Sequence, residues 1–263
     1  MLAMERWPLD ERAQIVGVLT DIDDTLTTEG AITEDAIDAL RQLKQAGLHV
    51  IAITGRPVGW CAPFAASWPV DAIVAENGAV ALRRHASGQI EKIYQQDAPT
   101  RIANFERMQQ VASRLLREVP GAALARDSAG RETDIAVDHS EFTHLPAERI
   151  AQVVALMQSE GMNATVSSIH INGWFGMHNK LEGARWIVRQ IYGRDLDAEI
   201  ARWVYVGDST NDQLMFAHFP HSVGVANVRR FEAQLQARPR YITRSERGAG
   251  FAELAACLLQ ARR

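Results

Sequence analysis

Two carboxylates, those of Asp21 and Asp23, directly follow an apolar run at residues 15–19 that is typical of a buried strand. Side chains two positions apart on an extended chain point the same way, so we expect both carboxylates to face one site at the carboxyl end of that strand. Two anions that close repel each other unless a cation or a shared proton relieves them. A bound divalent metal is the simplest relief, although aspartates are also ordinary turn residues.

A second apolar run, residues 50–53, is followed by a hydroxyl group, a glycine and a guanidinium in Thr54, Gly55 and Arg56. The Thr54 hydroxyl can donate a hydrogen bond to a phosphoryl oxygen, and Gly55 lets a backbone N–H approach that oxygen closely. Arg56 can pair with a phosphate or a carboxylate through two parallel hydrogen bonds. The same residues also suit the ordinary passage from a strand to a helix with Pro57 in its first turn, and both interpretations can hold together.

Lys180 stands at the start of a segment whose apolar residues recur at helical spacing. The helix dipole disfavours a lysine there, so this position suggests an anionic partner, although a lone lysine is usually a solvated surface group. Further along, the apolar run 203–206 leads into Asp208, an oxygen ligand suited to a hard cation such as Mg²⁺. The next residues, which end in Asn211, can bind an anion through backbone N–H groups, and Asp212 can hold Lys180 or a metal-bound water.

These segments occur in a consistent order, with DIDDTL at 21–26, ITGR at 53–56, then Lys180, and GDSTND at 207–212. Together they resemble the motifs of the haloacid dehalogenase (HAD) superfamily of phosphotransferases. One position departs from that pattern, because many members have glycine after the second aspartate, where this chain has Asp24. We expect the Asp24 side chain to point to solvent.

The resemblance implies a role for each matching residue. Asp21 would be the nucleophile that takes the phosphoryl group as an aspartyl-phosphate. Asp23 would be the general acid that protonates the leaving group and then the base that activates water. Thr54 and Lys180 would hold the phosphoryl oxygens, and Asp208 would ligate Mg²⁺ together with Asp21 and the backbone carbonyl of Asp23.

An acid at Asp23 favours chemistry at phosphate esters, because a poor alkoxide leaving group must be protonated. Mg²⁺ and Lys180 would offset the repulsion between an attacking carboxylate and a phosphate dianion. The expected activity is a Mg²⁺-dependent phosphatase that acts on a small phosphorylated metabolite, such as a sugar phosphate or a phosphoglycerate glycoside. A phosphomutase, a broad-specificity housekeeping phosphatase and a non-enzymatic metabolite-binding protein are the alternatives.

The composition is that of a globular chain, since 47% of the 263 residues are hydrophobic and 23% are charged. A formal net charge of −4 argues against nucleic acid or an anionic membrane as the main partner, which favours a small-molecule substrate. The two cysteines, Cys61 and Cys257, lie far apart and indicate no disulfide framework. No apolar run reaches membrane-span length and the N-terminal residues lack a signal peptide's apolar core, so the cytoplasm is the expected location. The oligomeric state stays open.

Strand and helix patterns alternate outside the middle of the chain, which predicts a doubly wound parallel sheet of the Rossmann-like α/β class. Between the second and third motifs the pattern changes to paired strands with longer helices, which predicts an α+β insertion. We expect a catalytic core at residues 1–82 and 179–263 and an inserted cap at residues 83–178. Such an insertion resembles the cap of HAD subfamily IIB, which includes Cof-type sugar phosphatases, sucrose-phosphate phosphatase and mannosyl-3-phosphoglycerate phosphatase.

Within this cap, Ser168, His170 and Asn172 alternate and are expected to share one face of a strand, just before two aromatic residues. Polar groups beside aromatic rings suit a sugar, but an exposed hairpin face is an equal alternative. Asn172 and Gly173 also form a pair typical of a tight turn between two strands. Three cap arginines could meet a second anionic group of the substrate, namely Arg126, Arg131 and Arg149.

Overall fold

Nine strands form the large sheet of the protein, for which a computed structural model describes residues 1–262. They are β1 (Leu2–Ala3), β2 (Gly17–Thr20), β5 (His49–Ile53), β6 (Ala72–Ala75), β7 (Val80–Arg84), β8 (Ile90–Tyr94), β13 (Trp203–Gly207), β14 (His221–Gly224) and β15 (Tyr241–Ile242). Their order across the sheet is β1-β15-β14-β13-β2-β5-β6-β7-β8. In this order, all neighbouring strands from β1 across to β6 are parallel. The last two strands, β7 and β8, pair antiparallel at one edge of the sheet.

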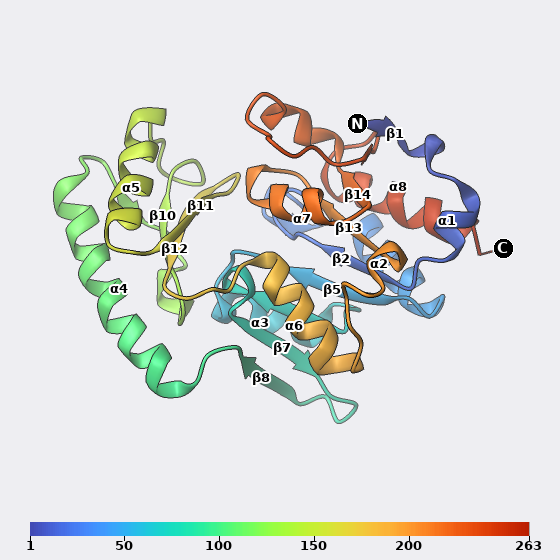
Figure 1. Cartoon of the computed structure of the whole chain (residues 1–263), viewed down its shortest axis with the longest axis horizontal. Coiled ribbons are helices and arrows are strands. Elements are labelled where there is room, and N and C mark those ends of the chain that lie inside the picture. Colours follow the sequence, from blue (N-terminus) through green and yellow to red (C-terminus); the bar gives the residue numbers. More distant parts are fainter. Residues whose placement is uncertain (263) are drawn as a thin grey trace.

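Helices cover both faces of this sheet, as Figure 1 shows. On one face lie α2 (Glu34–Gln45), α3 (Val58–Ser67) and α8 (Arg247–Gln260), and on the other lie α6 (Lys180–Tyr192) and α7 (Gln213–His218). Adjacent residues of one strand join different cores, since Val18 packs with the first set of helices and Leu19 with the second. This burial on both faces explains why the parallel strands are continuous apolar runs in the sequence. The predicted doubly wound sheet is confirmed.

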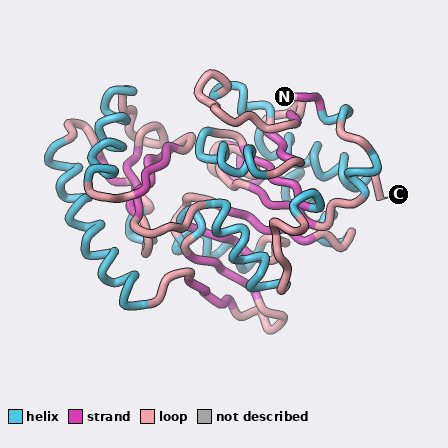
Figure 2. Tube along the Cα trace, viewed as in Figure 1, coloured by secondary structure: helices cyan, strands magenta, loops and turns pink. Residues whose placement is uncertain are grey.

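A second, smaller unit lies between β8 and α6 in the chain and to one side of the large sheet in space (Figures 1 and 2). Its elements are α4 (Ala98–Glu118), β9 (Ala123–Leu124), β10 (Ile135–Asp138), α5 (Ala147–Ser159), β11 (Asn163–Val166) and β12 (His170–Trp174). The strands form an antiparallel sheet in the order β11-β12-β10-β9. The two helices pack on it through a separate apolar core, which includes Leu115, Val137, Val153 and Ile171.

Short elements connect these parts. They are α1 (Leu9–Ala13), the hairpin β3 (Thr27–Thr28) and β4 (Ala31–Ile32), and the short 3₁₀ helices η1 (Met4–Arg6), η2 (Glu76–Gly78), η3 (Ser128–Gly130), η4 (Ile200–Arg202), η5 (Thr210–Asp212) and η6 (Ala226–Phe231). The β3–β4 hairpin follows directly on the segment that carries Asp21 and Asp23. In the part of the chain that the structure describes, no helix combines the length and the apolar character that crossing a membrane requires.

The expected insert, residues 83–178, begins within a hairpin that belongs to the large sheet. β7 pairs with β6, with Ala81 opposite Val74, and β8 continues the same sheet with Ile93 opposite Ala81. The change from parallel to antiparallel pairing therefore occurs before the chain leaves the large sheet. We propose that the cap begins near Asp97, which caps the first turn of α4 by accepting a hydrogen bond from the backbone N–H of Thr100 (2.8 Å).

The tight turn expected at Asn172 and Gly173 is wrong. Both residues lie inside β12, and the turn falls three residues earlier, at 167–169. A Cβ at Gly173 would come within 2.6 Å of the Met157 sulfur atom, so a larger residue there would require this buried side chain to move. Asn172 is held by hydrogen bonds from its amide nitrogen to the carbonyl of Gly55 and to Asp134. These contacts with distant segments outweigh the local preference of an Asn-Gly pair for a turn.

Glu76 connects the large-sheet unit to the smaller unit through buried hydrogen bonds. Its side chain is fully buried and accepts hydrogen bonds from the backbone N–H of Val58, at the start of α3. It also accepts from the backbone N–H groups of Glu132 and Thr133 and from the Thr133 hydroxyl, all in the smaller unit. Burial raises the pKa of Glu76 to about 7, while its hydrogen-bond donors oppose that shift.

Glu76→Ala is expected to lower the free energy of unfolding by about 3–5 kcal/mol, because several buried donors lose their acceptor at once. Urea denaturation measures this loss. Glu106→Ala, at an exposed position of α4, is the matched control and should change stability by less than about 0.5 kcal/mol. A loss below about 1 kcal/mol for Glu76→Ala would show that water or other acceptors replace its carboxylate.

Candidate active site

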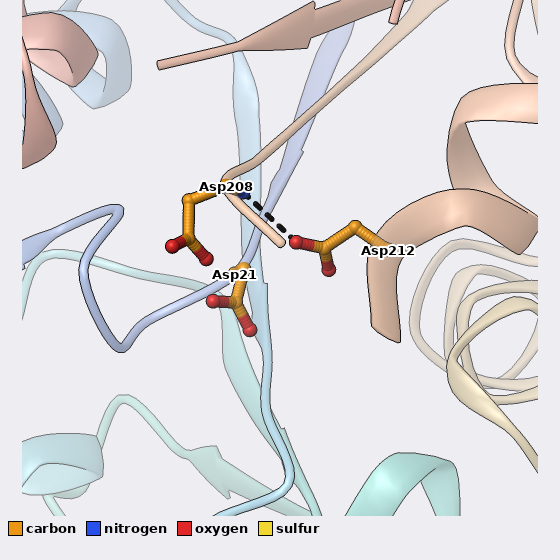
Figure 3. Close-up of side chains that lie close together, drawn as sticks. All are labelled: Asp21, Asp208 and Asp212. Carbon is orange, nitrogen blue, oxygen red and sulfur yellow. Dashed lines mark hydrogen bonds between the residues drawn. The ribbon is translucent and has the colours of Figure 1, made fainter. Parts of the chain in front are cut away.

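Two acids lie at the ends of adjacent parallel strands. Thr20 of β2 is opposite Val206 of β13, so Asp21 and Asp208 follow neighbouring strand ends. Figure 3 shows their carboxylates close together, with Asp212 beside them from the turn that follows Asp208. Oxygen atoms of these three buried aspartates lie within 4.8 Å of one another. The predicted gathering of acidic side chains at this edge of the sheet is therefore present.

Lys180 lies among these carboxylates. Its Nζ donates to Asp21 Oδ1 at 2.6 Å and to Asp212 Oδ1 at 2.7 Å. Asn179 holds the start of α6 in place by accepting from the backbone N–H groups of Leu181 and Glu182. Burial opposes the positive charge of Lys180, but the two carboxylates outweigh burial and raise its pKa. The ammonium group has three N–H bonds, so one remains available for a third acceptor.

Both carboxylate oxygens of Asp212 accept hydrogen bonds from other groups of the protein. Oδ1 accepts from Lys180 and from the Tyr205 hydroxyl. Oδ2 accepts from the backbone N–H groups of Asp208 (2.9 Å) and Ser209 (3.1 Å), and Figure 3 draws the first of these bonds. Asp212 therefore braces Lys180 and the turn that carries Asp208, which was one of the two roles expected for it.

Asp208 has one oxygen without a protein partner. Within residues 1–262, its Oδ1 is buried and receives no hydrogen bond, while its Oδ2 accepts from the amide of Asn227 at 3.1 Å. Burial raises the pKa of both Asp21 and Asp208, and the neighbouring carboxylates add to the rise. A cation beside Asp208 Oδ1 would satisfy that oxygen and offset the cost of burying these charges.

Asn227 is a residue of the site that the sequence analysis missed. It is buried, and its amide nitrogen donates both to Asp208 and to the backbone carbonyl of Asp24 (3.0 Å). Its amide oxygen accepts from the backbone N–H of Arg247 at 2.9 Å. One side chain thus joins the loop after β2, the acid after β13 and the start of α8. The signal was available, because Asn227 is a polar residue just beyond the end of β14 in the same parallel sheet.

The expectation that Asp24 points to solvent is wrong. Its carboxylate pairs with the Arg247 guanidinium at 3.0 Å, and its side chain is only 24% exposed. Asp24 and Arg247 both have positive φ angles, of 55° and 54°, a backbone conformation in which glycine is favoured. The ion pair thus joins two residues with positive φ angles, Asp24 and Arg247, and it gives the charged side chain at the position after Asp23 a partner.

Thr54 and Gly55 lie beside the acids, at the end of β5. The Thr54 hydroxyl oxygen accepts from the backbone N–H of Arg56 (3.0 Å), so its own hydrogen remains free to be donated. A Cβ on Gly55 would lie 3.3 Å from side-chain atoms of both Asn77 and Asn172, which is closer than most such contacts. A glycine is therefore favoured where the two units meet.

Arg56, for which the sequence allowed a phosphate or a carboxylate partner, has all three of its nitrogen atoms directed at carboxylates, and a phosphate-binding role for it stays a prediction. Its Nε donates to Asp23 Oδ1 at 3.0 Å. Its two terminal nitrogens donate to Asp127 (3.2 Å) and Glu141 (2.9 Å), both in the smaller unit. Sequence reasoning could not identify these partners, since they lie 71 and 85 residues away in the chain. Arg56 links Asp23 to the smaller unit.

The cap residues expected to meet the substrate take different positions. Ser168 lies in the turn before β12, so it does not share a strand face with the other two, and it lines the cavity at the site. His170 also lines this cavity, and its Nε2 lies 2.8 Å from Glu141 Oε2. Asn172 lines it as well, but its amide nitrogen already donates to Gly55 and Asp134. A role of these residues in substrate binding stays a prediction.

The three cap arginines have other partners. The side chain of Arg131 is only 2% exposed and pairs with Asp127 and Asp134. The Arg126 guanidinium lies over the ring of Phe142, with 3.8 Å to the ring centroid. Arg149 donates to the side chain of Gln152, within its own helix. None of the three lines the cavity at the site in the described part of the chain.

A small cavity lies where the two units meet. Both units line it, the large sheet with Asp21, Asp23, Thr54, Ser209 and Asn211, among others. The side-chain oxygen of Asn211 accepts from the Ser209 hydroxyl at 2.8 Å. The volume is about 10 Å³, which is room for roughly one water molecule. The smaller unit covers the acids closely in this arrangement.

Comparisons with known proteins agree with this architecture. The fold is similar to that of a Thermoplasma acidophilum protein (TM-score 0.70, 17% identity, 93% of this chain and 98% of that one). It is also similar to a HAD subclass IIB sugar phosphatase (TM-score 0.62, 16% identity, 93% of this chain and 97% of that one). A third similar structure is the sucrose-phosphatase of Synechocystis sp. with sucrose and phosphate (TM-score 0.65, 14% identity, 93% of this chain and 98% of that one).

At these identities the likeness to the three solved structures shows a shared fold. A comparison with curated proteins found no match to the chain. The family comparison adds the sequence evidence. Residues 18–116, which contain the first two motifs with Asp21 and Thr54, match the family of haloacid dehalogenase-like hydrolases. Over residues 18–116 the chain is therefore similar to the haloacid dehalogenase-like hydrolases, and its whole fold is similar to those of the three structures above.

Proposed function

We propose that the protein is a Mg²⁺-dependent phosphatase that hydrolyses a small phosphorylated metabolite through an aspartyl-phosphate on Asp21. The observation that carries the proposal is the buried pairing of Asp21 with Lys180 beside Asp208, whose Oδ1 has no protein partner within residues 1–262. A nucleophilic carboxylate, a cation and a free oxygen ligand are the parts that phosphoryl transfer to an aspartate requires.

The acidic residues fit Mg²⁺ by their chemistry. Asp21 and Asp208 offer carboxylate oxygens to the space between them, and Mg²⁺ prefers carboxylate, carbonyl and water oxygens. Asp21, Asp208 and the backbone carbonyl of Asp23 would hold the ion, while Asp212 is already occupied by hydrogen bonds. When bound, Mg²⁺ supplies positive charge that offsets the negative charge of the phosphoryl oxygens.

Asp21 performs the first step in this proposal. One of its oxygens attacks phosphorus, the bond to the leaving oxygen breaks, and the phosphoryl group remains on Asp21. The remaining N–H of Lys180 and the hydroxyl of Thr54 donate to the phosphoryl oxygens and orient the group. Lys180 is positioned to contact the phosphoryl oxygens before substrate binds, because Asp212 and the start of α6 hold its side chain in place.

Asp23 handles the protons in this proposal. It gives a proton to the leaving alkoxide in the first step. In the second step it removes a proton from the water that attacks phosphorus, the bond between phosphorus and the Asp21 oxygen breaks, and inorganic phosphate leaves. Arg56 holds the Asp23 carboxylate through its Nε and a terminal nitrogen, at 3.0 Å each, so the acid is oriented before substrate arrives. The small cavity has a volume of about 10 Å³, room for roughly one water molecule, so this proposal includes an opening of the smaller unit when substrate enters.

Phosphate release from sugar phosphates, phosphoglycerates, nucleotides and an aryl phosphate tests this function, with Mg²⁺ and with a chelator. The proposal predicts release that the chelator abolishes and that Mg²⁺ restores. A single preferred substrate would indicate a dedicated phosphatase, and similar efficiency on all would indicate a broad one. Folded protein that converts one isomer into another without net phosphate release would instead identify a phosphomutase.

Asn227→Ala is expected to weaken Mg²⁺ binding by about 10–100-fold, because Asp208 and the loop at Asp24 lose the amide that orients them. Calorimetric titration with Mg²⁺ measures the affinity directly, and the Mg²⁺ concentration for half-maximal phosphate release gives a second reading. Asn163→Ala, at an exposed position of β11, should leave both values unchanged. Unaltered Mg²⁺ affinity in Asn227→Ala would exclude the positioning role.

A further inference from the structure

A larger cavity adjoins the small one and shares Asp23, Arg56 and Ile169 with it. Its volume is about 360 Å³, and it lies between the loop after β2 and the segment after β10 in the smaller unit. If Asp21 receives the phosphoryl group and Asp23 protonates the leaving oxygen, the leaving alcohol lies on the Asp23 side. Asp23 lines this larger cavity, called here the leaving-group cavity, as well as the small one.

Negative charge dominates the lining of the leaving-group cavity. Four acids line it, namely Asp23, Asp24, Glu29 and Glu141. The only arginines in the lining are Arg56 and Arg247, within the described residues. Both are already paired with acids, Arg56 with Asp23, Asp127 and Glu141, and Arg247 with Asp24. A second anionic group on the substrate would therefore meet acids and find no unpaired cation among the described lining residues.

The remaining lining offers hydroxyl groups and an aromatic ring. Thr27 and Ser140 contribute hydroxyls, and Phe142 is 57% exposed. The Arg126 guanidinium lies over one face of this ring. An exposed aromatic ring beside polar groups suits an alcohol that carries both hydroxyls and apolar C–H faces.

We propose that the leaving-group cavity selects an uncharged, hydroxylated alcohol over one that carries a carboxylate or a second phosphate. Glu141 is the specificity-determining residue in this proposal, because it lines the leaving-group cavity and contacts both Arg56 and His170, which line the small cavity. The inference rests on the proposed phosphatase function and narrows it: sugar or polyol phosphates are substrates, and phosphoglycerate-type substrates are disfavoured.

Glycerol 3-phosphate and 3-phosphoglycerate test this proposal, since they differ only by a carboxylate in place of a hydroxymethyl group. Each is measured as a substrate and as a competitor of 4-nitrophenyl phosphate cleavage, so that a slow substrate still gives a value. The expected preference in kcat/KM for glycerol 3-phosphate is at least about tenfold, from the repulsion between like charges. A ratio at or below one, including equal competition, would overturn the proposal.

Glu141→Gln separates the charge of this residue from its shape. The variant should reduce the preference for glycerol 3-phosphate by at least about threefold, because one like charge is removed while the size and shape of the side chain are kept. Glu148→Gln, an exposed glutamate on α5, makes the same charge change away from the cavity and should leave the ratio unaltered. A ratio is independent of the fraction of folded enzyme, and an unchanged ratio in Glu141→Gln would remove its assigned role.

The outcomes also separate this inference from the proposed function. Cleavage of 4-nitrophenyl phosphate that depends on Asp21, combined with a preference for 3-phosphoglycerate, would overturn the selectivity alone. Folded protein that, with Mg²⁺ present, releases phosphate from none of these compounds and from no member of the substrate panel above would overturn the phosphatase function, and the selectivity with it.

Discussion

Asp21→Asn should reduce phosphate release by a factor of at least about 10³, because an amide cannot accept the phosphoryl group as a carboxylate does. The fold should survive the change. The amide oxygen of the variant side chain would still accept a hydrogen bond from Lys180 where Asp21 Oδ1 now does, and one buried negative charge would be removed. Phosphate release from the preferred substrate, with circular dichroism and thermal unfolding on the same sample, measures both.

Asp10→Asn is the matched control for this variant, because it makes the same chemical change at an exposed position of α1. It should retain full activity. Activity above a few percent in Asp21→Asn, on protein with deamidation excluded by mass spectrometry, would argue against covalent catalysis. Loss of the folded state would move the test to Asp21→Glu, which keeps the charge but displaces the nucleophile.

The second large effect concerns Asp23→Asn. The variant should slow cleavage of alkyl phosphates by about 10²–10⁴-fold, because their alkoxide leaving groups need a proton. Aryl phosphates should lose much less in their first step, since a phenolate leaves without protonation. The comparison of kcat/KM for an alkyl and an aryl phosphate, in wild type and variant, isolates the acid role of Asp23.

Equal losses on both substrates would count against Asp23 as the acid. They would be the expected result if Asp23 served only to hold Arg56, whose Nε and terminal nitrogen contact its carboxylate. Asp127→Asn makes the distinction, because Asp127 also pairs with Arg56 but does not line the small cavity. A loss through Arg56 alone would appear in that variant too, without dependence on the leaving group.

The parallel sheet could be predicted from the sequence because its strands carry local signals. The apolar runs 50–53 and 203–206 lie within β5 and β13, and the run 15–19 before Asp21 overlaps β2. Strands buried on both faces give continuous apolar runs, and parallel strands bring their carboxyl ends to one edge. From these two regularities alone, without knowledge of side-chain contacts, one can predict that Asp21 and Asp208 lie close together.

The contacts between the two units could not be predicted in the same way. Glu76 accepts hydrogen bonds from Glu132 and Thr133, and Arg131 donates to the carbonyl of Gly55 at 2.9 Å. These pairs are separated by 56, 57 and 76 residues, and nothing in the sequence near either partner indicates the other. A buried glutamate and a buried arginine look like surface residues in a sequence, because their burial depends on a partner that folds against them.

The error at Asn172 and Gly173 has the same origin. An Asn-Gly pair favours a tight turn when local conformation decides, but here the packing of Met157 against Gly173 and the hydrogen bonds of Asn172 decide instead. For Arg56 the sequence allowed either a phosphate or a carboxylate partner, because an arginine binds both oxyanions. The structure supplies three carboxylates for it, two of them from the smaller unit.

Chemical trapping of the intermediate tests the central claim most directly. Enzyme that is mixed with its preferred substrate and Mg²⁺, quenched in acid during turnover and treated with borohydride should contain homoserine in place of aspartate at position 21. This product forms because borohydride reduces an acyl phosphate but leaves a free carboxylate intact. Peptide mass spectrometry should find it at residue 21 alone, and only with substrate present. Rapid turnover with no modified residue, or modification at Asp23 or Asp208 instead, would contradict the account.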